Sequence, residues 1–250
     1  MRIVVIGGTG LIGSKVVTKL TEHGHEAVAA SPNTGVNTLT GEGLAEVLVG
    51  TDVVIDVSNS PSFEDAAVLD FFTTSTTNLL AASAAAKVGH YLALSVVGSE
   101  KMTAGGYMRA KVAQESLIKQ SGQAYSLVHA TQFFEFVQSI AHTATEGETV
   151  RLSHALIQPM AAEDVATAVA RTSVGTPLNS TLEVAGPVAL GLDDFIRAGL
   201  ARTNDPRTVV TDDSATYFGV HLDERSLLPN ESATIFSTTF DEWAAAQVAA

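Results

Sequence analysis

The sequence predicts an α/β fold built on a doubly wound parallel sheet with helices on both faces. Short apolar strands alternate with helical stretches from residue 2 to about residue 130, which is the pattern of right-handed βαβ units. Hydrophobic residues make up 46% of the chain and charged residues 16%, as expected for a parallel sheet that is covered on both faces. A glycine-rich turn joins the first strand to the first helix, where such folds bind nucleotides.

This turn is the most informative stretch of the chain. An apolar run, Ile3 to Ile6, is followed by Gly7-Gly-Thr-Gly-Leu-Ile-Gly13 and then by a helical pattern from Ser14 onward. In a strand–turn–helix context this spacing indicates a dinucleotide fingerprint. Gly7 permits a tight turn, Gly10 lets the backbone approach a pyrophosphate, and Gly13 lets the helix pack closely on the strand. Because the amides at a helix start attract phosphate, we predict that the cofactor is bound by Gly7, Thr9, Gly10, Leu11, Ile12 and Gly13.

The elements of the first half follow from periodicity and from the glycines that end helices. Strands are expected at residues 3–6, 26–30, 52–57, 91–97 and 125–129, with a stunted strand within 34–40. Helices are expected at 14–23, 43–49, 66–87 and 106–120, of which the first, third and fourth end near Gly24, Gly89 and Gly122.

Beyond residue 131 the alternation loosens. Strands are expected at 150–152 and 182–184, and helices at 162–172, 192–203 and 240–248, whereas 204–240 is rich in turns. No segment has the composition of a linker. We therefore expect a single domain over residues 1–250, in which 1–130 form the dinucleotide-binding core and 131–250 form mostly a substrate-side lobe.

Composition excludes several classes of function. The formal net charge of −13 removes the electrostatic attraction on which nucleic-acid binding depends, so we expect no nucleic-acid partner. The chain has no Cys, and its His, Asp and Glu residues show no metal-ligand spacing, so we predict no metal site. No apolar run is long enough to span a membrane, and the first strand starts at residue 2, which leaves no room for a signal peptide. We predict a cytoplasmic protein without membrane contact.

Three residues could carry chemistry at the substrate. Ser95 ends a strand, and twelve residues later Tyr107 and Lys111 lie four apart, on one face of a helix. Reduction of a carbonyl needs a proton donor beside the hydride acceptor, and an ammonium near a phenol lowers the phenol pKa from about 10. We predict that Tyr107 supplies the proton, that Lys111 lowers the pKa of Tyr107 and binds the nicotinamide ribose, and that Ser95 hydrogen-bonds the substrate oxygen.

Several motifs together resemble those of a known family. Gly7-Gly-Thr-Gly-Leu-Ile-Gly13, Asp56-Val-Ser-Asn59, Ala93-Leu-Ser-Val-Val-Gly98 and Tyr107-Met-Arg-Ala-Lys111 are similar to motifs of the atypical short-chain dehydrogenase/reductases. The branch they resemble most holds NmrA-like proteins and NAD(P)H-dependent quinone reductases, and Ala130-Thr131-Gln132-Phe133 and Ala161-Ala-Glu-Asp-Val-Ala166 fit it too. The resemblance implies a Rossmann-type sheet with a small C-terminal substrate lobe.

The resemblance also implies where ligands lie. The residues it brings to the cofactor are Ser58, Asn59, Ser95, Lys111, Ala130 and Thr131. On the substrate side we expect Val97, Phe133 and Phe134, with the alternative that the two phenylalanines belong to the core. His129 stands where this family often has Arg, and we interpret it as a buried strand histidine rather than a catalytic one.

The adenosine end of the cofactor is expected beyond the second strand. NAD-specific sites place an acidic residue there, whereas this chain has Ser31, Pro32, Asn33 and Thr34. We predict that Ser31 and Asn33 contact the ribose. NADP(H) is favoured because no carboxylate repels a 2′-phosphate, and NAD(H) is also accepted because no Arg or Lys lies between Lys19 and Lys87.

These observations predict an NAD(P)H-dependent oxidoreductase acting on a small carbonyl or quinone-like substrate. Two alternatives follow from the same family. One is a non-catalytic redox sensor that binds the dinucleotide and reports its state to a partner protein. The other is an accessory reductase in a biosynthetic hydroxylation, of which an aromatic polyketide would be the substrate.

Overall fold

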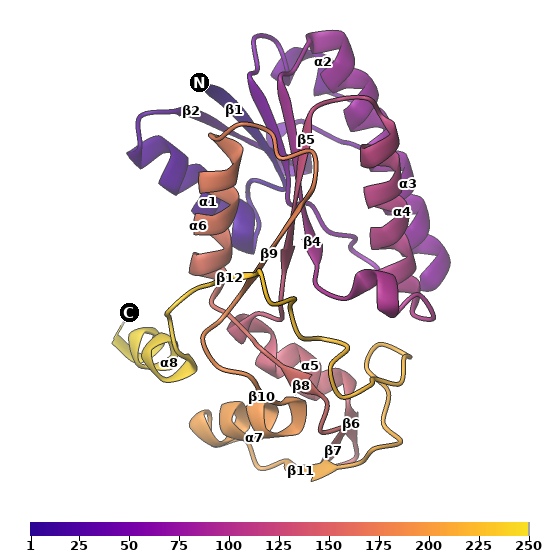
Figure 1. Cartoon of the computed structure of the whole chain (residues 1–250), viewed down its shortest axis with the longest axis vertical. Helices are drawn as coiled ribbons and strands as arrows, with labels where there is room; N and C mark the ends of the chain where they lie inside the picture. Colours follow the sequence, from indigo (N-terminus) through magenta and orange to yellow (C-terminus); the bar gives the residue numbers. More distant parts are fainter. Residues whose placement is uncertain (250) are drawn as a thin grey trace.

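The computed structural model describes residues 1–249 and contains a seven-stranded parallel sheet at its centre (Figure 1). The strand order is β12-β9-β5-β4-β3-β1-β2. The strands are β1 (Arg2–Ile6), β2 (Glu26–Ala30), β3 (Val53–Asp56), β4 (His90–Val96), β5 (Tyr125–Ala130), β9 (Thr181–Ala185) and β12 (Thr234–Ile235). From β1 the chain adds β2 on one side and then crosses over to add β3 on the other side. Open α/β sheets bind ligands at such a switch point, beyond the carboxyl ends of the strands. The predicted fold class is confirmed.

Helices cover both faces of this sheet because successive strand residues point to opposite sides. Ile3 and Val5 pack with α1 (Leu11–Glu22) and α6 (Ala162–Ser173). Val4 and Ile6 pack on the other face. That face is covered by α2 (Leu44–Val47), α3 (Asp65–Ala86) and α4 (Gly106–Gln120), as Figure 1 shows.

A smaller lobe lies beyond the carboxyl ends of the strands (Figure 1). Its elements are α5 (Val137–Thr143), β6 (Thr145–Glu146), β7 (Thr149–Leu152), β8 (Leu156–Ile157), β10 (Leu190–Gly191), α7 (Leu192–Arg202), β11 (Thr208–Thr211) and α8 (Phe240–Ala249). The lobe has its own apolar cluster, in which Phe134, Phe195 and Leu227 are buried. The second half of the chain also returns to the main sheet through β9 and β12, so the core and the lobe interleave in sequence.

One expected element is absent and several were not expected. Residues 34–40 form no strand: a 3₁₀ helix at Pro32–Thr34 leads into turns at Gly35 and Gly41, whose φ angles are +83° and +80°. These left-handed conformations break an extended run, and β2 is therefore the edge of the sheet. The short strands β6, β8, β10 and β11 and the helix α5 lie where the sequence shows no strong periodicity. In the part of the chain described, no helix is both long and apolar enough to cross a bilayer.

Candidate functional site

The glycine turn has the geometry that its sequence predicts. Gly7 has φ +77°, a left-handed conformation that favours glycine. A Cβ atom on Gly13 would overlap the Gly7 carbonyl oxygen, so only glycine lets α1 approach the turn this closely. A Cβ atom on Gly10 would meet just that oxygen, at 3.3 Å. The turn therefore leaves open space at Gly10 while it is closed at Gly13.

The start of α1 presents unpaired amides to this space. Among the helical hydrogen bonds, Ser14 N donates to Gly10 O at 3.0 Å, so the three amides between these residues precede the first helical bond. Thr9, Gly10 and Leu11 are exposed. An exposed helix start with free amides and a positive dipole end suits a phosphate group.

The ends of β2 and β3 lie beside the glycine turn. Gly7 N donates to Ala30 O at 2.9 Å, which brings Ser31 next to the turn. Ser31 is 6% exposed, and its Oγ has no hydrogen-bond partner among residues 1–249. An unpaired buried hydroxyl is costly, and a ligand oxygen would satisfy it. Asn33 is exposed on the following 3₁₀ helix.

On the other side of the turn, the backbone of Ser58 would lie 2.9 Å from a Cβ atom on Gly7. Ser58 is held in place because its N and Oγ donate to Asp56 Oδ1, at 3.0 and 2.6 Å. Asn59 follows it and is exposed. The structure thus brings together those predicted cofactor residues that follow the adjacent strands β1, β2 and β3.

Tyr107 and Lys111 share a face of α4, as predicted, and both contact the ring of Phe72. The Tyr107 ring meets it edge-on, with centroids 5.9 Å apart, and Lys111 Nζ lies 4.4 Å from its centroid. The effect on the phenol differs from the prediction. Burial raises the pKa of Tyr107 to about 12, so Tyr107 is a neutral phenol and its pKa is not lowered by Lys111.

The ammonium of Lys111 is directed into the core. Its Nζ donates to Leu94 O at 2.9 Å and to the side chain of Gln114, whose Nε2 in turn donates to Asp56 Oδ2 at 3.0 Å. Burial lowers the pKa of Lys111 to about 8, although the charges of Asp56 and Glu115 oppose that shift. Lys111 therefore ties α4 to β4, in a position where the predicted contact with a ribose would require it to leave these partners.

Ser95 also has an internal partner instead of a free hydroxyl. Its Oγ donates to Glu115 Oε1 at 2.6 Å, and His129 Nε2 lies 2.9 Å from the same oxygen. Ser95 and His129 are register partners on β4 and β5, so both face α4. With 3% of its surface exposed, Ser95 is shielded from a substrate. His129 is a buried strand residue, as interpreted from the sequence.

Glu115 is the centre of this polar cluster. Burial alone would raise the pKa of Glu115. A hydrogen bond and charge from His129, together with hydrogen bonds from Ser95 and Lys119, outweigh burial and lower this pKa from 4.5 to about 2. A depressed carboxyl pKa stabilises the fold above pH 4.5, and that contribution is lost as pH falls from about 4.5 to about 2.

We expect Glu115→Gln to lose about 3 kcal/mol of unfolding free energy at pH 7. The difference from wild type should shrink as the pH is lowered through that window, because the wild-type carboxylate becomes protonated. Denaturant titrations from pH 7 to pH 3 measure it, with Glu100→Gln on the exposed surface as the matched control. A constant difference at every pH would contradict the assignment.

The remaining predicted residues are placed as follows. Ala130 and Val97 are buried beside each other, since Val97 N donates to Ala130 O at 3.0 Å. Thr131 Oγ1 donates to Gln158 O at 2.6 Å. Phe134, at 2% exposure, packs in the lobe core against Phe195, Phe240 and Trp243. Phe134 therefore belongs to the core of the lobe, which was the alternative to its expected place on the substrate side. Phe133 is half-buried and stacks on Phe136.

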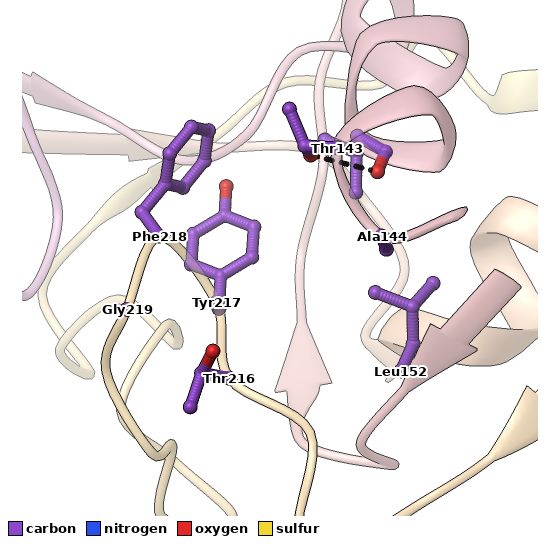
Figure 2. A pocket seen from close by; sticks show the side chains of 8 residues that line it. Thr143, Ala144, Leu152, Thr216, Tyr217, Phe218 and Gly219 are labelled. Atoms are coloured by element: carbon purple, nitrogen blue, oxygen red, sulfur yellow. Dashed lines mark hydrogen bonds between the residues drawn. The ribbon is translucent and has the colours of Figure 1, made fainter. Parts of the chain in front are cut away.

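Three aromatic residues on the side of Tyr107 that faces the lobe were not singled out by the sequence. Phe63, from the loop after β3, lies 5.8 Å from the Tyr107 ring and 6.2 Å from the ring of Phe218. Phe218 in turn contacts Tyr217 at 4.7 Å. Burial raises the pKa of Tyr217, and the amide of Gln132 opposes that shift. Tyr217 and Phe218 also line a cavity in the lobe (Figure 2). Gln132, by contrast, lies in the family-like motif Ala130-Thr131-Gln132-Phe133.

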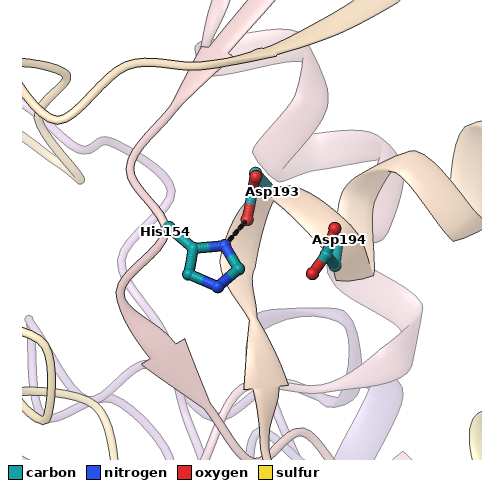
Figure 3. Close-up of side chains that lie close together, drawn as sticks. All are labelled: His154, Asp193 and Asp194. Carbon is teal, nitrogen blue, oxygen red and sulfur yellow. Dashed lines mark hydrogen bonds and ion pairs between the residues drawn. The ribbon is translucent and has the colours of Figure 1, made fainter.

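One grouping in the lobe has the residue types of a metal site. Atoms of His154, Asp193 and Asp194 lie within 4.8 Å of one another (Figure 3). Both carboxylate oxygens of Asp193 already have protein partners. His154 Nδ1 lies 2.7 Å from Oδ1, and Thr211 Oγ1 donates to Oδ2 at 2.5 Å. The bond to Asp193 raises the pKa of His154. We interpret the grouping as a structural link between the loop that joins β7 to β8, the start of α7 and the end of β11.

Comparison with known proteins gives one match in sequence. No protein-family model matches the chain. The photosystem II assembly factor Ycf39 of Cyanophora paradoxa is 29% identical over 149 residues, which cover 54% of this chain and 46% of that protein. The match thus spans less than half the length of that relative.

Comparison of structures gives matches over nearly the whole chain. A dTDP-4-dehydrorhamnose reductase from Bacillus anthracis in complex with NADP has a TM-score of 0.74 at 13% identity, covering 100% of this chain and 98% of that one. An NADPH-dependent quinone oxidoreductase from Escherichia coli has a TM-score of 0.68 at 16% identity, covering 99% and 100%. WbmH of Bordetella bronchiseptica in complex with NAD⁺ has a TM-score of 0.71 at 15% identity, covering 99% and 97%. The resemblance to short-chain dehydrogenase/reductases is confirmed at the level of the fold.

Proposed function

We propose that this protein is an NAD(P)H-dependent oxidoreductase that reduces a small carbonyl or quinone-like compound. The proposal rests on the glycine turn and Tyr107 lying at the same edge of the sheet. The open glycine turn adjoins Ser58, and the same loop continues to Phe63, whose ring lies 5.8 Å from that of Tyr107. The loop after β3 thus runs from the proposed phosphate-binding turn to the proposed proton donor, which supports a single site made of both.

The residues at this edge fit a dinucleotide. The amides at the start of α1 would hold the pyrophosphate, where Gly10 leaves open space. The unpaired Ser31 Oγ and the exposed Asn33 would contact the adenosine ribose. Ser58, Asn59 and Thr131 would continue the cofactor site from the pyrophosphate toward Tyr107. Bound in this way, the reduced cofactor supplies the hydride.

Tyr107 would donate the proton to the substrate oxygen. With a pKa of about 12 the phenol stays protonated at physiological pH, so Tyr107 carries the proton that it would donate. Lys111 and Ser95 would act as positioning residues, because Lys111 joins α4 to Leu94 and Ser95 joins β4 to Glu115. These bonds fix the helix that carries Tyr107 against the sheet.

The chemistry of the structural neighbours supports this substrate class. One is named an NADPH-dependent quinone oxidoreductase and another a dTDP-4-dehydrorhamnose reductase, and both names describe reduction of an oxidised carbon. An aromatic polyketide, as in the accessory-reductase alternative, belongs to the same chemical class.

A second candidate function is a dinucleotide-binding sensor that acts through a partner protein. The internal bonds of Lys111 and Ser95 favour it, because neither group is free to contact a substrate. The name of the Ycf39 relative, an assembly factor, also describes a role with other proteins.

Steady-state assays separate the two functions. The full-length protein is incubated with NADPH and a panel of quinones, ketones and aldehydes, and NADPH consumption is followed alongside cofactor binding by calorimetry. Turnover of any panel member above the protein-free rate supports the reductase. Tight NADPH binding with no consumption across the panel would support the sensor.

The dinucleotide preference is tested at the end of β2. We expect wild type to bind NADPH several-fold more tightly than NADH, and Ser31→Asp to invert that order. A carboxylate repels the 2′-phosphate and accepts hydrogen bonds from the ribose diol. Ser31→Ala is the matched control, because it removes the hydroxyl without adding charge. Equal effects of the two substitutions would place the adenosine contact elsewhere.

A further inference from the structure

A chain of buried polar groups joins the end of β3 to α4. It consists of Asp56, Gln114 and Lys111, and we call it the buried bridge. Gln114 Nε2 donates to Asp56 Oδ2 at 3.0 Å, and the ammonium of Lys111 donates to Gln114 Oε1. Each of the three residues is at most 3% exposed. Polar groups buried this deeply are costly unless they are hydrogen-bonded, so the three side chains depend on one another for their partners.

The chemistry of the groups fixes the direction of each hydrogen bond in the buried bridge. An ammonium only donates and a carboxylate only accepts, so the carboxamide of Gln114 can take just one orientation between them. The other bonds of Asp56 agree with this direction. Its Oδ1 accepts from Ser58 N and Oγ, and its Oδ2 also accepts from the Tyr91 hydroxyl at 3.3 Å. The carboxylate of Asp56 thus accepts four hydrogen bonds.

The buried bridge connects the two parts of the proposed site. At one end Asp56 holds Ser58, where the loop proposed to contact the cofactor begins. At the other end Lys111 lies one helical turn beyond Tyr107 on α4. The same loop reaches Tyr107 again through the exposed ring of Phe63, whose centroid lies 5.8 Å from that of Tyr107. The loop and the helix are therefore joined twice, once inside the core and once at the surface.

We propose that Asp56 and Gln114 are positioning residues of the reductase. They hold the loop that begins at Ser58 in a fixed place relative to Tyr107, so that the cofactor and the phenol meet in a reactive arrangement. Hydride and proton transfer depend on such placement, and a misplacement of about 1 Å can cost about 100-fold in rate. The inference rests on the proposed function and adds two residues to those that carry it.

A charge swap tests the buried bridge, because only two of the four possible pairs at its centre are complementary. In Asp56→Asn the asparagine oxygen is needed by Ser58, so its amide group meets that of Gln114, donor against donor. In Gln114→Glu two carboxylates repel each other. The double variant Asp56→Asn/Gln114→Glu again sets a donor against an acceptor. Its new carboxylate still accepts from Lys111, and the Tyr91 hydroxyl can turn from donating to accepting.

The wild type, the two single variants and the double variant are compared by kcat and KM on a panel substrate and by calorimetric titration with NADPH. We expect each single variant to lower kcat about tenfold or more and to weaken NADPH binding about fivefold, with little change in KM for the substrate. The double variant should recover kcat and NADPH affinity to within about threefold of wild type. Asp70→Asn and Gln120→Glu, on the exposed surfaces of α3 and α4, are the matched controls and should change neither value.

The outcomes separate this inference from the proposed function. Wild-type kcat and NADPH affinity in the folded single variants would overturn the positioning role and leave the reductase intact. A double variant as impaired as the two single variants combined would do the same. In a protein that consumes no NADPH with any panel substrate the reductase fails. Loss and recovery of NADPH affinity in the same four proteins would then still support a bridge that positions the cofactor loop, and unchanged affinity would overturn both.

Gln114→Met replaces the single variants if thermal melts show that they do not fold. Methionine has nearly the shape of glutamine, so the substitution removes both hydrogen bonds of the carboxamide without setting like groups against each other. We expect kcat to fall about tenfold and KM for the substrate to stay close to that of wild type. Wild-type kcat in folded Gln114→Met would overturn the proposal.

Discussion

Gly10→Val is expected to weaken dinucleotide binding about 100-fold or more, a loss of roughly 3 kcal/mol, while the protein still folds. Gly10 has an extended conformation, φ −85° and ψ −176°, that valine adopts readily. Its Cβ atom would meet just the Gly7 carbonyl oxygen, at 3.3 Å. The branched side chain therefore occupies the space of the pyrophosphate without disrupting the turn. Calorimetric titration with NADPH and a thermal melt together measure both effects.

Gly89→Val is the matched control for this substitution. Gly89 lies next to β4, and a Cβ atom there would contact Asp52 O at 3.5 Å, an ordinary van der Waals distance. It should bind NADPH as wild type does. A folded Gly10→Val protein with wild-type affinity would mean that the glycine turn does not bind the cofactor, and both proposed functions would fail.

Tyr107→Phe is expected to lower kcat by about 100-fold or more with no change in NADPH affinity. The substitution removes the phenolic proton and retains the ring that packs on Phe72 and Phe63. Stability should therefore remain close to that of wild type. Steady-state kinetics on a substrate from the panel, with NADPH binding measured in parallel, give the result.

Tyr125→Phe, at the start of β5 and away from the site, is the control for loss of a tyrosine hydroxyl. Its kcat should equal that of wild type. Full activity in Tyr107→Phe would show that the proton comes from another group, for which the neighbouring phenol of Tyr217 is the first to test.

The core of the fold was predictable because its residues follow strict periodicities. The apolar run of β1 sends alternate side chains into two separate clusters, one on each face, and only a doubly covered sheet accommodates that pattern. Gly7 and Gly13 show their roles in the sequence because no other residue suits a left-handed turn or so close an approach. Local rules therefore fixed both the sheet and the phosphate-binding turn.

The partners of buried polar groups were not predictable in the same way. Ser95 at the end of a strand looks available, yet its hydroxyl is used by Glu115, which lies 20 residues further along the chain on α4. The same holds for Lys111, whose partners come from β4 and from α4 itself. Tyr217 reaches the site from a turn-rich stretch without periodicity. Such contacts depend on tertiary packing rather than on local pattern.

The indole of Trp243 gives the lobe a built-in spectroscopic probe. It is the one tryptophan of the sequence, it stacks on Phe240, and its Nε1 donates to Glu135 Oε1 at 2.9 Å. Glu135 also accepts from the amide of Ala162 at the start of α6. Fluorescence emission from this single indole therefore reports, without any label, whether α8 stays seated on the segment that follows Thr131. A shift of that emission on adding a ligand would reveal coupling between the site and the C-terminal helix.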